Sequence, residues 1–297
     1  MKLVDLARDP GLRAGLAAGL FTTLVVAAVA LLRRGRGAVP LAGLAAAVAT
    51  VIGLRISTEV PEVPGELVAG LAALGLASLA PKLPGPALAY RLVAVTPGAV
   101  LVVVAADLDL AWAVPFTVAA TVLGAILVTE FDRLHARTGL GPVLLGVTAL
   151  GVYGCVPDTE EASVLVGAAL PVALLGWPKP LASLGAAGAH MAVGLVVWTA
   201  AFDGRGRPGA IVGATACLGI MMLEPLLDGA RRRAPLAAGR WCRRSFALAG
   251  THLALVAVCS RVAGIRSSPV TAAVIAALAF VAAAVVLEAV TRLDARR

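Results

Sequence analysis

The chain has 297 residues, of which 60% are hydrophobic and only 14% are charged, and its mean hydropathy is +0.95. Soluble domains carry about 25% charged residues, so this composition excludes a soluble globular protein, whose surface the polar residues could not cover. The net charge of +8 does not indicate nucleic-acid binding, because the basic residues lie in short loops beside apolar segments, where membrane topology accounts for them.

Eleven apolar segments fill most of the chain, and each approaches the roughly 20 residues that a membrane-spanning helix needs. They are continuously apolar, without the alternation of a barrel strand, and backbone groups in lipid must pair internally. We therefore expect an all-α, polytopic membrane helix bundle, with residues 1–297 as one domain. The first segment precedes RRGRG rather than a cleavage site, so it is predicted to be permanent. The segments are 12–32, 38–54, 65–80, 87–106, 110–129, 139–155, 163–178, 181–201, 210–227, 245–260 and 268–289.

The loops between these segments alternate in charge. RRGR at 33–36 and DRLHAR at 132–137 are basic, whereas TEVPEVPGE at 58–66 and PDTEE at 157–161 are acidic. Because Lys and Arg are retained in cytoplasmic loops, this pattern predicts an outside N-terminus and an inside C-terminus in a bacterial plasma membrane. The largest basic block lies in loop 228–244 and is expected to meet anionic headgroups at the inner leaflet. Its members are Arg231, Arg232, Arg233, Arg240, Arg243 and Arg244.

A weak internal repeat accompanies the charge pattern. The sequence Gly37-x-x-Pro40 recurs as Gly139-x-x-Pro142, and the acidic loops VPEVPGE and VPDTEE follow at similar spacing. Two parallel four-helix units and a truncated third would explain the matches, as in transporters built from parallel repeats. Chance matches in a chain rich in Ala, Gly and Pro are the alternative. The repeat hypothesis divides the chain into units 1–109, 110–203 and 204–297.

Ionisable side chains within apolar segments are costly in lipid, so each one requires a reason. His190 lies in the middle of a small-residue helix, and His252 lies in the tenth segment after Thr251. Each could relay protons or bind a polar group, and each could equally make an interhelical hydrogen bond. Glu224 precedes Pro225, so it is either part of a site beside a helix kink or a carboxylate that extends toward Arg231–Arg233.

The predicted outer face carries carboxylates that could bind a cation or act as acid and base. Topology alone would also place acids there. Sequence motifs for nucleotide binding, serine hydrolysis or zinc proteolysis are absent. No catalytic residue, metal site or cofactor is predicted, and four dispersed cysteines favour free thiols over a Cys155–Cys259 bridge. The candidate outer acids are Glu59, Glu62, Glu66, Asp158, Glu160 and Glu161.

Three functions from different classes fit these observations. The leading hypothesis is a small transporter or flippase for a hydrophobic or lipid-linked solute, because the chain has many spans and little extramembrane mass. The second is a non-catalytic membrane subunit or scaffold, because few aromatics and many Gly and Ala surfaces suit close packing against a partner. The third is an enzyme that acts on a lipid-linked substrate through the outer carboxylates.

Overall fold

The computed structural model describes residues 9–33, 38–57, 62–79, 87–157, 159–229, 243–263 and 268–295. Within these ranges the chain forms twelve helices and no strand, which confirms the all-α prediction. The helices are α2 (Pro10–Leu32), α3 (Ala42–Ile56), α4 (Gly65–Ala77), α5 (Ala87–Val104), α6 (Ala113–His135), α7 (Leu140–Cys155), α8 (Glu160–Ala173), α9 (Ala186–Asp203), α10 (Pro208–Ala216), α11 (Gly219–Gly229), α12 (Arg243–Val262) and α13 (Pro269–Ala295).

Several of these helices are long and apolar enough to cross a membrane. In the described part of the chain they are α2, α6, α9, α12 and α13, and α10 with α11 makes a sixth if the bent pair is one span. Helices α3, α4, α5 and α7 are apolar but shorter. At 1.5 Å per residue, a helix of 13–16 residues covers about 20–24 Å of a hydrocarbon core that is about 30 Å thick. The count of eleven spans therefore stays a prediction.

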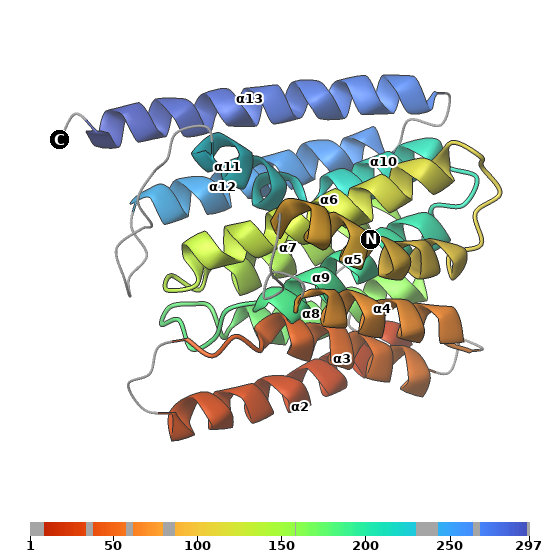
Figure 1. Cartoon of the computed structure of the whole chain (residues 1–297), viewed down its shortest axis with the longest axis horizontal. Coiled ribbons are helices and arrows are strands. Elements are labelled where there is room, and N and C mark those ends of the chain that lie inside the picture. Colours follow the sequence, from red (N-terminus) through yellow and green to blue (C-terminus); the bar gives the residue numbers. More distant parts are fainter. Residues whose placement is uncertain are drawn as a thin grey trace.

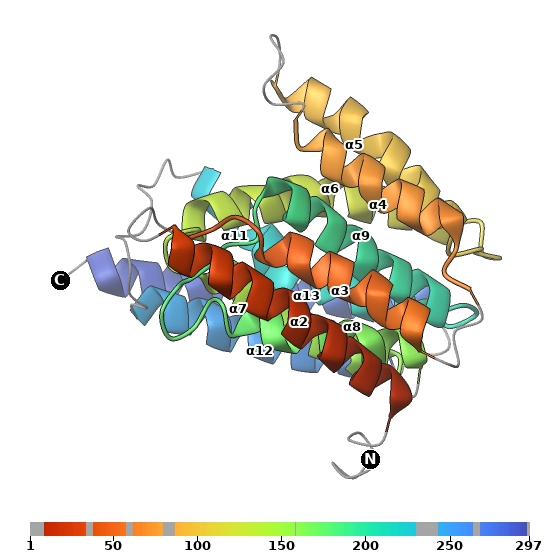
Figure 2. The ribbon, with the colours of Figure 1, turned by 90° about the horizontal axis from the view of Figure 1, so that it is seen from below.

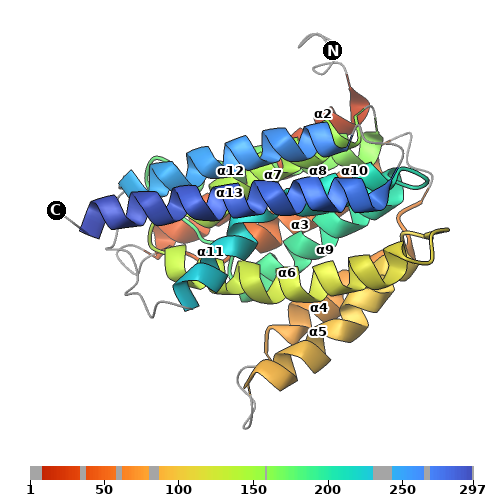
Figure 3. The same cartoon turned by 90° about the horizontal axis from the view of Figure 1, so that it is seen from above.

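The helices lie roughly along one direction, with α2 and α13 on opposite sides of the bundle (Figure 1). Helix α2 packs on α3 and α8, and α12 packs on α13 and α7. The α4–α5 hairpin lies at the edge of the bundle when it is seen from below (Figure 2), with α4 against α9 and α5 against α6. Helices α12 and α13 lie side by side in the view from above (Figure 3). The innermost helices are α7, α8 and α9, which are buried along most of their length.

Close approach of small residues holds the inner helices together. A Cβ added to Gly15 of α2 would lie 2.3 Å from the carbonyl oxygen of Val164 in α8. A Cβ on Gly188 of α9 would lie 2.4 Å from the amide nitrogen of Leu44 in α3. Contacts this short let backbones approach directly, which is how helices associate in membranes, where lipid competes equally for apolar side chains.

One end of the bundle is called here the His135 end. There Val39 pairs in parallel with Ala182, just before α3 and α9 begin, and Glu224 of α11 meets Arg244 of α12. The opposite end is called the Asp203 end. At that end Thr159 donates a hydrogen bond to the Asp203 carboxylate.

Two predicted segments, 163–178 and 181–201, are wrong at their shared boundary. Helix α8 ends at Ala173, and residues 174–185 run without helix before α9 begins at Ala186. Pro178 and Pro180 explain the interruption, because proline lacks an amide donor and clashes with a preceding turn. Gly185, with φ of +73°, then turns the chain into α9.

The placement of 132–137 in a basic loop is also wrong in part, because α6 continues to His135 rather than ending near residue 129. Phe131, Asp132 and His135 are all at most 5% exposed, since their face of α6 meets other parts of the bundle. After α6 ends at His135, the chain changes direction at Gly139, whose φ is +68°, and α7 begins at Leu140.

Candidate functional site

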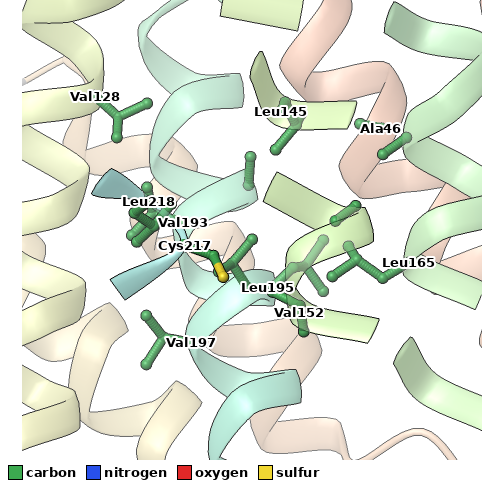
Figure 4. Packing of buried hydrophobic residues seen from close by; sticks show 14 of the residues in the cluster. Ala46, Val128, Leu145, Val152, Leu165, Val193, Leu195, Val197, Cys217 and Leu218 are labelled. Atoms are coloured by element: carbon green, nitrogen blue, oxygen red, sulfur yellow. The ribbon is translucent and has the colours of Figure 1, made fainter. Parts of the chain in front are cut away.

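The predicted segment 210–227 is a broken helix rather than a continuous one. Helix α10 ends at Ala216, α11 begins at Gly219, and the two axes are bent by 53°. Both Cys217 and Leu218 at the break are essentially fully buried. In the core they lie among apolar side chains of α7 and α9, including Val152 and Val193 (Figure 4). Non-helical backbone at such depth is tolerated only where protein supplies its hydrogen bonds.

A side chain of α7, itself in contact with α12, supplies part of that bonding. The Thr148 hydroxyl of α7 donates to the Cys217 carbonyl at 3.1 Å, and its oxygen lies 3.0 Å from His252 Nε2 of α12. Because a hydroxyl carries one proton, Thr148 must accept from His252 Nε2–H. The ring is also within reach of the Leu144 carbonyl, and its Nδ1 has no aligned partner among the described atoms. The chain Cys217–Thr148–His252 thus ties the break to α7 and α12.

Three thiols surround the same break. The Cys155 and Cys217 sulfurs are 3.9 Å apart, and Cys259 also contacts Cys217. All three are buried and free, which confirms that prediction for these residues, whereas Cys242 lies outside the described residues. Within the described ranges, no group of three or more His, Cys, Asp or Glu residues is arranged to hold a metal ion.

Glu224 belongs to a buried charged cluster at the His135 end. Its carboxylate lies 3.2 Å from His135 Nε2 of α6 and 2.5 Å from the Arg244 guanidinium of α12, with its side chain 4% exposed. Glu224 therefore pairs with Arg244, and its predicted pairing with Arg231–Arg233 lies outside the described residues. These contacts of Glu224 join α6, α11 and α12. Removing the charge of either Glu224 or Arg244 would leave the other charge buried and uncompensated.

Asp132 is a buried residue that the sequence interpretation missed. It is 5% exposed and accepts backbone hydrogen bonds from Leu184 and Gly185, each at 2.8 Å. The carboxylate therefore fixes the end of the non-helical stretch where α9 begins. The detectable signal was the i,i+3 spacing of Asp132 and His135, which places both on one face of a continuing helix.

His190 joins α9 to α4. Its Nδ1 lies 2.9 Å from the Leu74 carbonyl oxygen, and the side chain is 4% exposed. This contact is the interhelical hydrogen bond that small neighbouring residues permit. His190 and His252 thus have separate partners, on α4 and α7, and the structure does not combine them in one site.

The candidate outer acids are not gathered in one place by the contacts that they make. Glu62 and Glu66 are exposed, and Glu160 and Glu161 begin α8. The Glu161 carboxyl lies close enough to the Asp203 carboxyl at the end of α9 for the two groups to interact.

Several predicted residues cannot be placed. Glu59, Asp158, Arg231, Arg232, Arg233 and Arg240 lie outside the described residues. Of the basic block, Arg243 begins α12, and Arg244 turns inward to Glu224.

An apolar groove opens beside the broken helix, between α6, α10, α11 and α13. Its volume is about 340 Å³, and its walls include Phe116, Ala119, Met222, Ala277 and Phe280. Thr215 of α10 contributes the only hydroxyl among the residues that line it. A smaller groove of about 180 Å³ lies between α12 and α13.

No protein-family model matches the chain, and no curated protein is similar to it. The fold and the described contacts therefore define only a class, an all-helical bundle with membrane-capable helices and one broken helix at its centre.

Proposed function

We propose that the protein is a multi-pass transporter or flippase-like protein that moves a hydrophobic or lipid-linked solute. The observation that carries the proposal is the broken helix α10–α11, whose break lies inside the bundle against Thr148 and His252. Discontinuous helices with exposed backbone groups recur at the substrate sites of secondary transporters. A continuous helix would serve a purely structural role at lower cost, because it satisfies its own backbone.

The chemistry around the break favours an uncharged or amphiphilic solute. The nearest groups are a hydroxyl, an imidazole and thiols, whereas the buried Glu224 carboxylate is already paired with the Arg244 guanidinium. The groove beside α10 is apolar and faces outward between α6 and α13, both of which are long enough to span a bilayer. A solute could therefore enter sideways from the lipid and lie against Thr215 and Ala216, the last residues of α10 before the break.

The proposal includes the sidedness that the loop charges predict. Eleven spans would place the N-terminus outside, the C-terminus inside and the His135 end at the cytoplasmic face of a bacterial plasma membrane. Impermeant thiol labelling of Cys242 in intact cells tests this orientation, since Cys242 lies in the predicted inner loop. We expect Cys242 to be protected from the reagent, and rapid labelling without permeabilisation would show the opposite orientation.

A membrane subunit that packs against a partner is the second candidate. The α4–α5 hairpin favours it, because it lies at the edge of the bundle and exposes large apolar side chains such as Leu88 and Val93. Purification from native membranes in a mild detergent tests this reading. A stoichiometric partner that α4–α5 substitutions release would support it.

Flux in proteoliposomes tests the transport proposal. The purified protein is reconstituted with fluorescent amphiphiles that differ in chain number and headgroup, and dithionite bleaching of the outer leaflet reports their movement. We expect faster movement than in protein-free vesicles for at least one class. Equal movement for every class, with the protein shown to be monodisperse, would contradict the proposal.

A further inference from the structure

The groove between α6, α10, α11 and α13 has one polar atom that lacks a partner. Thr215 is 5% exposed, and its hydroxyl oxygen makes no hydrogen bond within the described part of the chain. The buried threonines Thr22, Thr50 and Thr117 each donate to the carbonyl four residues earlier, whereas the Thr199 hydroxyl, buried inside α9, also lacks a partner but lines neither groove. A buried hydroxyl left unpaired costs about 1–3 kcal/mol, so a bound ligand that accepts its proton would recover that loss.

The walls of the groove determine what else can bind there. They are formed mainly by alanine methyl groups, the rings of Phe116 and Phe280 and the side chains of Leu123, Val212 and Met222, with no charged side chain among the lining residues. A volume of about 340 Å³ is near the lower end of ligand sites, which range from about 300 to 1,000 Å³. The space suits one flexible alkyl chain better than the two chains of a phospholipid. Exposed lining residues, among them Ala119 and Ala277, leave the groove open to the lipid side.

The geometry points to a binding site for one long alkyl chain, whose ester or amide carbonyl accepts a hydrogen bond from Thr215. This inference deepens the proposed function and rests on it for its meaning, since it names the substrate class. The chain would lie along α6 and α13, and its polar linkage would sit beside α10 one residue before the helix ends. A plain alkane would fill the same groove but has no acceptor for the Thr215 hydroxyl proton.

Photo-crosslinking of the full chain in phospholipid nanodiscs tests the site. The probe is methyl palmitate that carries a mid-chain diazirine, and labelled peptides are mapped by mass spectrometry. We expect labelling to concentrate on the groove-lining parts of α6 and α13. The substitution Ala277→Leu fills the groove and should reduce that labelling by about tenfold. Ala282→Leu is the matched control, because it makes the same change at an exposed position of α13 in the smaller groove.

Competition by unlabelled compounds against the photo-crosslinking probe separates the contribution of the Thr215 hydrogen bond from that of burying the alkyl chain. With Thr215→Val, unlabelled methyl palmitate should compete about three- to tenfold less well, the equilibrium effect of one net hydrogen bond. Hexadecane should compete equally well in both proteins. Thr96→Val is the matched control, since the exposed Thr96 hydroxyl already donates to Leu92.

Labelling that is as dense on α2 and α5 as in the groove, or that survives Ala277→Leu, would overturn the inference. Site-specific labelling without flux in proteoliposomes would refute transport and leave the binding site standing. Flux with diffuse labelling would refute the site alone.

Discussion

Asp132→Asn offers a quantitative test of how the His135 end is built. The native carboxylate accepts two backbone hydrogen bonds, from Leu184 and Gly185, each at 2.8 Å, which is the length of a charge-assisted bond. Asparagine keeps one acceptor oxygen and places an amide donor against the second N–H. One buried donor is then unpaired, which costs about 1–3 kcal/mol, or a factor of about 5–150 in the local opening equilibrium.

Hydrogen exchange of the non-helical stretch measures this effect directly. In Asp132→Asn, the peptide that covers residues 174–185 should exchange faster by that factor, whereas peptides from α2 and α8 should change little. Asp109→Asn makes the same change at an exposed loop position and should have no effect. Exchange at 174–185 within about twofold of wild type would refute the claim that Asp132 anchors this stretch.

Three further predictions concern helix packing and are checked by thermal unfolding of the purified protein. Arg244→Ala should lower the free energy of unfolding by about 3 kcal/mol, because Glu224 stays buried without its partner. Adding Glu224→Gln to that variant should recover part of the lost stability. If the losses of the two single variants simply add in the double variant, the pairing is contradicted. Gly15→Val should lower the free energy of unfolding by about 1–3 kcal/mol, because the new side chain meets the α8 backbone. Gly65→Ala has open space around it and should be neutral. Equal melting temperatures for Gly15→Val and wild type would argue against the close α2–α8 contact. His190→Ala should lower the free energy of unfolding by about 1–3 kcal/mol without abolishing flux, because the hydrogen bond from His190 to α4 is structural. Loss of flux at wild-type stability would assign His190 a functional role instead.

Much of the helical architecture could be predicted from apolar runs alone. Every predicted segment has at least one helix within it, since lipid or a dry protein interior forces continuous apolar backbone to pair with itself. Boundaries failed where local composition was misleading. Charge made residues 132–137 resemble a loop, yet Asp132 and His135 have buried partners that come from residues about 50–90 positions away.

The break in α10–α11 could not be predicted, for a related reason. The run from Gly209 to Leu223 is apolar without proline, so nothing local marks Cys217 as a bend. The bend is compensated by Thr148 from another helix, and that contact exists only in the folded bundle. The non-helical stretch at 174–185 was different, because Pro178 and Pro180 were visible markers of an interruption. The division into units 1–109, 110–203 and 204–297 stays a prediction.

The central claim is that the broken helix serves solute movement, and the most direct test is flux of a fluorescent single-chain amphiphile in proteoliposomes. Wild-type protein should move the probe faster than protein-free vesicles, and Thr148→Val should slow it, because that substitution removes both hydrogen bonds that hold the break. Thr22→Val, which alters a buried hydroxyl bonded only within α2, is the control and should keep wild-type flux. No flux from folded wild-type protein, or equal flux in Thr148→Val and wild type, would contradict the account.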